Sequence, residues 1–217
     1  LAAELAGEGI SGGGGVRGGV DTAVFEPARR SAGLRTSWGV NGQQPVCLYV
    51  GRIAPEKNLA LVRRSFAEIR LRHPAARMVW VGDGPSARQL AGEHPDHHFA
   101  GMRTGEDLAA HYASADLFLF PSLTETYGNV VAEAMASGLP VVAYRSAAAA
   151  ELVADGENGV VAPPGDEEAF IAAALWMLEA PGRLAELSLA ARLVMLPRSW
   201  AGVVATFEDV AREAIAG

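Results

Sequence analysis

Residues 121–142 read PSLTETYGNVVAEAMASGLPVV, and the rest of the chain is organised around this stretch. The apolar run Leu117–Phe120 just before it is short enough for a strand that is buried on both faces. The turn Glu125–Asn129 then opens an amphipathic helix, predicted over Tyr127–Ser137, which Gly138–Pro140 ends. This order of strand, loop and helix directs free backbone N–H groups at whatever lies above the strand.

A helix start of this kind favours anions, and Gly128 lets a phosphate or a sugar approach the main chain closely. Glu125 lies in the loop, whereas Glu133 lies about two turns into the helix and leans back toward its N-terminus. Two carboxylates beside a phosphate-binding helix end suit a sugar nucleotide. The stretch alone leaves open a plainer alternative, in which Glu125 pairs with the helix dipole and Glu133 is solvated.

The composition excludes some classes of protein. The net charge is −7, from 18 basic and 25 acidic residues, which argues against nonspecific binding to nucleic acid. No apolar run approaches the roughly 20 residues that span a bilayer, so we expect a soluble cytoplasmic protein, with a peripheral contact at the inner face of the membrane still compatible. The single cysteine, Cys47, lies in an apolar run, which predicts a buried thiol and allows no internal disulfide.

Apolar runs alternate with helical patterns along the chain from residue 46. The runs predict strands at 46–50, 78–81, 98–100, 117–120, 141–144 and 159–162. Helices are predicted at 59–72, 87–93, 106–114, 127–137, 148–153, 167–179, 183–196 and 200–216. Continuous apolar strands alternating with helices indicate a parallel sheet covered on both faces. The predicted fold class is therefore α/β, a Rossmann-like doubly wound parallel sheet with a C-terminal helical tail.

Ligands of such folds bind at the carboxyl ends of the strands. Arg52 and Lys57 follow the first predicted strand, and they should share one edge of the sheet with Glu125 and Glu133. The chain has 17 arginines but only one lysine, Lys57, and a compact ammonium group is common at phosphate sites. Chance on an arginine-rich background is the alternative, but a bound diphosphate accounts for both cations and the helix end together.

Two weaker signals suggest other functions. Gly82-x-Gly84-x-x-Ala87 resembles a relaxed dinucleotide fingerprint, so an NAD(P)-binding Rossmann oxidoreductase stays as an alternative, although Asp83 would face the pyrophosphate. The segment Glu93–His98 contains three histidines, but it is a proline-containing loop without further ligands at suitable spacing. We therefore expect an exposed turn there rather than a metal site.

Taken in order, these motifs resemble the C-terminal, donor-binding domain of family 4 retaining glycosyltransferases, also called glycosyl transferases group 1. That family has the GT-B fold, in which two Rossmann-like domains face each other. The resemblance spans residues 16–216. It rests on Gly18–Thr22 with Phe25 and Pro27, Gly51–Arg52, Glu56–Asn58, Val81–Pro85, Glu125 with Glu133, Asp155–Gly159 and Pro163–Asp166.

The resemblance implies a role for each matching position. Arg52 and Lys57 would bind the donor diphosphate, Glu125 would contact the transferred sugar, and Glu133 would hold the ribose hydroxyls. Arg52, Lys57 and Glu125 are thus the expected catalytic residues, and a glycosidase-like nucleophilic role is the alternative for Glu125. Arg103 would contact the base or the ribose. Backbone amides would bind phosphate or sugar oxygens at Tyr127, Gly128 and Asn129.

The family transfers a hexose with retention and without a bound metal or other cofactor, the nucleoside-diphosphate sugar being the donor substrate. Ala147–Ala150 matches a subgroup often assigned to GDP-mannose-dependent α-mannosyltransferases. The glycan or lipid acceptor would bind an N-terminal domain that the sequence lacks. We accordingly expect residues 1–20 to be an interdomain remnant and linker, 21–198 the donor domain, and 199–217 a helix that packs toward the missing domain.

Two further expectations follow from the missing half. The isolated chain would expose the apolar face of its last helix and self-associate. A noncatalytic nucleotide-sugar-binding module is the third function class that the sequence leaves open.

Overall fold

The computed structural model describes residues 19–123, 129–180 and 182–199. Its centre is a six-stranded sheet with the strand order β3-β2-β1-β4-β5-β6, and every neighbouring pair is parallel. The strands are β1 (Val46–Val50), β2 (Arg77–Val81), β3 (His98–Gly101), β4 (Leu117–Phe120), β5 (Val141–Tyr144) and β6 (Val160–Ala162). The sheet confirms the predicted doubly wound parallel architecture.

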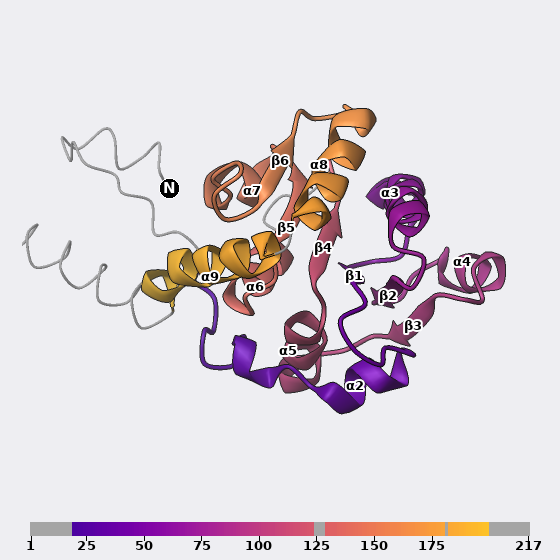
Figure 1. Cartoon of the computed structure of the whole chain (residues 1–217), viewed down its shortest axis with the longest axis horizontal. Helices are drawn as coiled ribbons and strands as arrows, with labels where there is room; N and C mark the ends of the chain where they lie inside the picture. The colour runs from indigo at the N-terminus through magenta and orange to yellow at the C-terminus, as the bar shows by residue number, and fades with distance from the viewer. Residues whose placement is uncertain (1–18, 124–128, 181, 200–217) are drawn as a thin grey trace, which may run out of the picture.

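Helices cover both faces of the sheet (Figure 1). The α-helices are α2 (Ala32–Ser37), α3 (Leu59–Arg72), α4 (Ala87–Glu93), α5 (Gly105–Ser114), α6 (Asn129–Ala136), α7 (Ala147–Leu152), α8 (Glu167–Glu179) and α9 (Arg183–Met195). Short 3₁₀ turns occur at η2 (Pro27–Arg29), η3 (Pro55–Lys57) and η4 (Leu196–Arg198). Helices α3 and α8 pack together on one side, while α5 and α6 adjoin on the other and α9 packs across α6.

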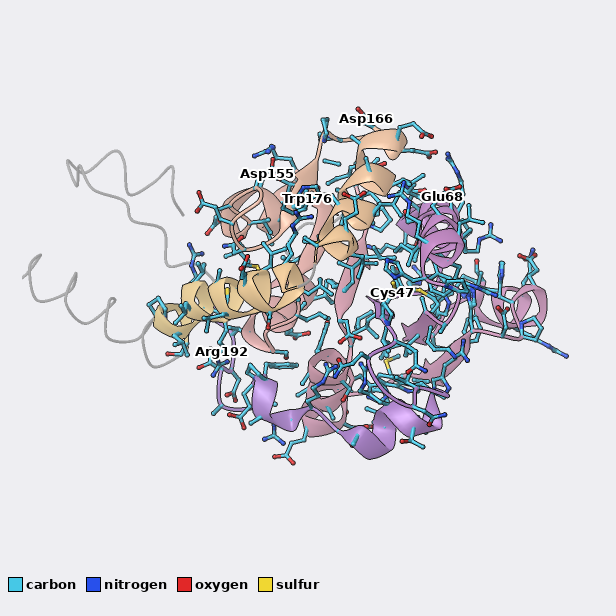
Figure 2. The ribbon with its side chains drawn as sticks, viewed as in Figure 1. Cys47, Glu68, Asp155, Asp166, Trp176 and Arg192 are labelled. Atoms are coloured by element: carbon cyan, nitrogen blue, oxygen red, sulfur yellow. The ribbon has the colours of Figure 1, made fainter. Side chains whose placement is uncertain are left out.

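The core explains why the central strands carry almost no polar residues. Every residue of β1, β4 and β5 is buried, because helices lie above and below these strands. Cys47 lies at the middle of this core (Figure 2), and burial raises the pKa of its thiol far above the ordinary value. The prediction of a buried thiol is confirmed.

Several predicted boundaries differ from the structure by one residue, and α2 was not predicted at all. Helix α6 ends at Ala136, one residue before the predicted end, because Gly138 has a φ of +69° and lets the Gly138 and Leu139 amides bond back to the last turn. Helix α2 is short and contains a glycine, so its sequence signal is weak. Its stability comes from tertiary contacts of Arg35, which donates to the Ser114 carbonyl oxygen at 2.8 Å and to Asp116 at 2.9 Å.

Hydrogen bonds connect residues 20–25, at the start of the described chain, to α9 and the residues after it. Val20 pairs with Ser199 in an isolated parallel bridge. Arg192 of α9 (Figure 2) donates hydrogen bonds to the carbonyl oxygens of Phe25 and Ala136 at 2.7 Å and of Thr22 at 3.0 Å. Among the described residues, no helix combines the length and apolar character needed to cross a membrane. The predicted helix 200–216 lies outside the described residues.

Candidate functional site at the carboxyl edge of the sheet

Strands β1 and β4 lie side by side at the centre of the sheet, and the chain leaves them in opposite directions. After β1 it goes to β2, and after β4 it goes to β5 on the other side. In doubly wound sheets, ligands bind in a crevice at such a switch point, outside the carboxyl ends of the strands. The turn 51–58 follows β1 at this edge of the sheet, and residues 121–123 follow β4. Of the predicted site residues, Glu125, Tyr127 and Gly128 lie outside the described residues.

The turn after β1 is held rigidly by the turn after β2. The Ile53 amide donates to the Asp83 carbonyl oxygen at 2.9 Å, and the Ser86 amide donates to the Ile53 carbonyl oxygen at 3.1 Å. A Cβ at Gly82 or Gly84 would collide with the backbone of this turn, and both glycines have φ values above +130°. Gly82 and Gly84 are therefore explained by close packing of two turns, which removes the main reason for a dinucleotide fingerprint.

Arg52 and Lys57 lie on this rigid turn, as the sequence predicted. The buried Tyr49 hydroxyl donates to the Arg52 carbonyl oxygen at 3.0 Å and supports the turn from below. The Arg52 guanidinium lies 3.2 Å from Glu56, with side chains 64% and 45% exposed. An ion pair this exposed contributes at most about 1 kcal/mol, so the guanidinium can exchange Glu56 for an anionic ligand at little cost.

Lys57 ends the 3₁₀ turn η3 and is partly buried. Asn58 follows in the left-handed conformation, with φ +52°, and redirects the chain into α3. Asn129 is the first described residue of α6 and is exposed, which leaves it accessible to a ligand at the crevice.

Glu133 is not the solvated helix residue of the plainer alternative. It is partly buried on α6, and the hydroxyl of the fully buried Tyr112 on α5 donates a hydrogen bond to its Oε2 at 3.1 Å. Burial raises the pKa of Glu133, and the Tyr112 hydrogen bond partly opposes that rise. Tyr112 was missed by the sequence reasoning, because nothing in the sequence shows that α5 and α6 are neighbours.

Arg103 follows the edge strand β3, so β2 separates its strand from β1 at the switch point. Its Nε donates to the Ala100 carbonyl oxygen at 2.9 Å and its Nη1 to Asp107 at 3.0 Å. Both bonds hold the side chain within its own turn. The predicted contact of Arg103 with a base or ribose stays a prediction.

The histidine-containing segment is a turn in which Glu93, Pro95 and Asp96 are exposed, as expected, while its three histidines are partly buried. Side-chain atoms of His94, Asp96 and His97 come within 4.8 Å of one another. However, Trp80 Nε1 donates to His97 Nδ1 at 3.1 Å, so the neutral ring carries its proton on Nε2 and offers no free nitrogen to a metal. Asp96 pairs with Arg70, and Arg63 Nη1 lies 3.3 Å from His94 Nε2. The positive charges of Arg70 and Arg63 beside these potential ligand atoms would also repel a metal cation.

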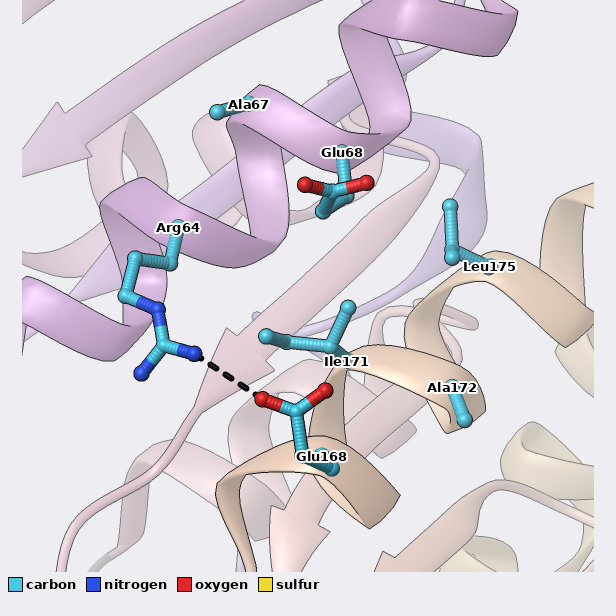
Figure 3. Close-up of a pocket in the computed structure, with 7 residues that line it drawn as sticks. All are labelled: Arg64, Ala67, Glu68, Glu168, Ile171, Ala172 and Leu175. Atoms are coloured by element: carbon cyan, nitrogen blue, oxygen red, sulfur yellow. Dashed lines mark hydrogen bonds and ion pairs between the residues drawn. The ribbon is translucent and has the colours of Figure 1, made fainter.

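A groove of about 420 Å³ lies between α3 and α8 (Figure 3). It is lined by Arg64, Ala67, Glu68, Glu168, Ile171, Ala172 and Leu175, and an ion pair of 3.0 Å joins Arg64 to Glu168 across it. None of the predicted site residues lines this groove. We therefore assign the candidate site to the switch-point crevice.

A doubly wound sheet with cations and a helix end at its switch point defines an α/β domain that binds a ligand at the carboxyl edge. Residues 44–180 match the family model for glycosyl transferases group 1, and the chain belongs to that family. This membership confirms the resemblance that the sequence motifs indicated.

Individual relatives agree with the family assignment. The chain is 36% identical over 183 residues to a GDP-mannose-dependent alpha-mannosyltransferase of Corynebacterium glutamicum, covering 84% of this chain and 43% of that protein. It superposes on sucrose-phosphate synthase from Thermosynechococcus elongatus with a TM-score of 0.77 at 25% identity, covering 93% of this chain and 52% of the other. For Anabaena HepE in complex with UDP-glucose, the TM-score is 0.74 at 25% identity, with 92% and 56% covered. The chain thus spans about half the length of these proteins.

Proposed function

We propose that this chain is the donor-binding half of a retaining glycosyltransferase that takes a hexose from a nucleoside-diphosphate sugar. The observation that carries the proposal is the position of Arg52 and Lys57 on a rigid turn at the switch point, opposite the start of α6. Cleavage of the sugar–phosphate bond puts negative charge on the diphosphate. Cations held in place before the reaction stabilise that charge without having to reorganise.

The same arrangement supports transfer without a bound metal, because Arg52, Lys57 and the helix end supply the positive potential that a metal would otherwise supply. The acceptor hydroxyl would attack on the face from which the diphosphate leaves, and the leaving phosphate would take the proton. We assign no enzymic nucleophile. Glu133 would hold the ribose hydroxyls, while Glu125 would contact the hexose.

GDP-mannose is the proposed donor, because the Corynebacterium glutamicum relative is named a GDP-mannose-dependent enzyme. Ala147–Ala150, at the start of α7, is the sequence feature that agrees with this subgroup. A glycan or a lipid would serve as acceptor and would bind a domain beyond these residues. The proposal of a further, acceptor-binding domain rests on length, because the chain covers only 43% of the Corynebacterium glutamicum relative.

Calorimetry with GDP, UDP, GDP-mannose, UDP-glucose and NAD tests the donor assignment. We expect GDP-mannose to bind and NAD not to bind; binding of NAD alone would instead support the oxidoreductase alternative.

Sugar transfer is tested by a radiolabelled-donor assay in EDTA, which compares this chain with a version extended to the length of the relatives. We expect only the extended protein, and not this chain, to transfer sugar, because positioning of the acceptor is worth about 7–11 kcal/mol of the barrier. No transfer by either protein would leave the noncatalytic module as the better account.

A further inference from the structure

Glu133, the predicted ribose-binding carboxylate, accepts a hydrogen bond from the hydroxyl of Tyr112, a fully buried side chain. The two residues lie on different helices, α5 and α6. The bond occupies one carboxylate oxygen, and a carboxylate has capacity for several further hydrogen bonds. Glu133 can therefore keep Tyr112 as a partner while it accepts from a ligand.

The tyrosine hydroxyl has a fixed position because its ring is held by the core. Phe25 and Phe118 contact the Tyr112 ring edge-to-face, with ring centroids 5.9 Å and 5.7 Å away. Two such contacts on a fully buried ring leave it little freedom. Glu133, by contrast, has three rotatable side-chain bonds and lies only partly buried. A fixed donor at one oxygen selects among the rotamers of the carboxylate.

We propose that Tyr112 is a positioning residue, which orients the Glu133 carboxylate to accept hydrogen bonds from the ribose hydroxyls of the donor nucleotide. This inference rests on the proposed function, since that proposal assigns the ribose to Glu133. Tyr112 itself does not touch the ligand, and it acts through the carboxylate. The hydrogen bond also favours the ionised carboxylate, which is the better acceptor.

A consequence for pH follows from this bond. In the described residues, Tyr112 is the titratable group that interacts with Glu133, and its hydrogen bond lowers the pKa of Glu133 against the effect of burial. Loss of the hydroxyl would raise that pKa further. The affinity for a nucleotide would then begin to fall at a higher pH as the solution is acidified.

Tyr112→Phe tests the inference, because it removes the donor and keeps the ring. Calorimetry would compare the variant with the wild-type chain, using GDP or UDP, whichever binds the wild type more tightly, and its 2′,3′-dideoxy analogue. We expect about a tenfold loss for the ribonucleotide, the worth of a hydrogen bond to a charged group. For the dideoxy analogue we expect less than about a twofold change, since the ribose hydroxyls are absent. The acid limb of the affinity–pH profile should move to higher pH.

Ser65→Ala is the matched control, because it also removes a buried, hydrogen-bonded hydroxyl, but from α3 on the opposite face of the sheet. It should leave both affinities unchanged. If Tyr112→Phe does not fold, Phe25→Leu loosens the hold on the Tyr112 ring and leaves both Tyr112 and Glu133 in place, and a smaller loss confined to the ribonucleotide is expected. Equal losses for both nucleotides, or none, would overturn the positioning role. A wild-type chain that binds no nucleotide would overturn the proposed function instead.

Discussion

Gly82 lies so close to Gly51 that any side chain at Gly82 would collide with the Gly51 carbonyl oxygen. The contact joins the turns after β2 and β1, and the second of these carries Arg52 and Lys57. The glycine therefore belongs to the support of the candidate site, although it contacts no ligand in our proposal. Its φ of +131° adds a backbone reason for glycine at the same position.

Gly82→Ala should destabilise the fold by about 2–5 kcal/mol, the sum of a strained backbone and an overpacked contact. Chemical denaturation measures the change. Gly92→Ala is the control, because Gly92 lies in α4 with open space around its Cα and no positive φ. It should be neutral or should stabilise by up to about 1 kcal/mol. Equal stabilities of the two variants would contradict the close approach.

Lys57→Ala should weaken binding of the nucleotide sugar by at least about 1.5 kcal/mol, and Lys57→Arg should restore it only in part, since a planar fork does not replace a compact ammonium. Calorimetry measures both effects. Arg72→Ala, at the other end of α3 and about 20 Å from its start, removes one positive charge as well. It should leave the affinity unchanged. Wild-type affinity in Lys57→Ala would remove Lys57 from the proposed site.

Ala147→Gly should stabilise the chain, by about 0.5–1 kcal/mol, because Ala147 has a φ of +43° that glycine adopts without strain. Ala150→Gly, in the same helix and equally exposed, should destabilise by a similar amount. The two substitutions delete the same methyl group and differ in the sign of their effect. Thermal or chemical unfolding of both variants measures it, and the same sign in both would show that Ala147 is unstrained.

His97 should make the fold less stable as the pH falls from about 6.5 toward 4. Burial lowers the pKa of His97 from 6.5 to about 4, with Asp96 opposing that shift and His94, Arg70 and Arg63 adding to it. Between these values the unfolded chain takes up a proton that the folded chain does not, so acidification favours unfolding.

His97→Gln keeps a side chain that can accept a hydrogen bond and cannot titrate. The free energy of unfolding, measured in urea at pH 7 and pH 5, should depend less on pH in this variant than in the wild-type chain. Some dependence should remain, because burial also lowers the pKa of His98. An unchanged slope would mean that His97 titrates alike in the folded and unfolded chains.

Local sequence located the elements well where burial is complete. Strands β1, β4 and β5 and helices α3, α4 and α8 begin and end at the predicted residues, because uninterrupted apolar runs and helical periodicity mark them clearly. Helix α2 escaped prediction because Arg35 stabilises it by reaching Ser114 and Asp116, about eighty positions away. An interaction at that separation leaves no local pattern.

The candidate site divides in the same way. The sequence by itself determined that Arg52, Lys57 and Glu133 follow strands of one parallel sheet, because residue type and spacing suffice for that inference. Only the tertiary structure decided that Tyr112 donates to Glu133, 21 positions away, and that Gly82 and Gly84 serve packing rather than a dinucleotide. The physical reason is that helix neighbours and turn contacts depend on how the sheet is wound. Side chains from separate elements meet only after the strands have taken their order.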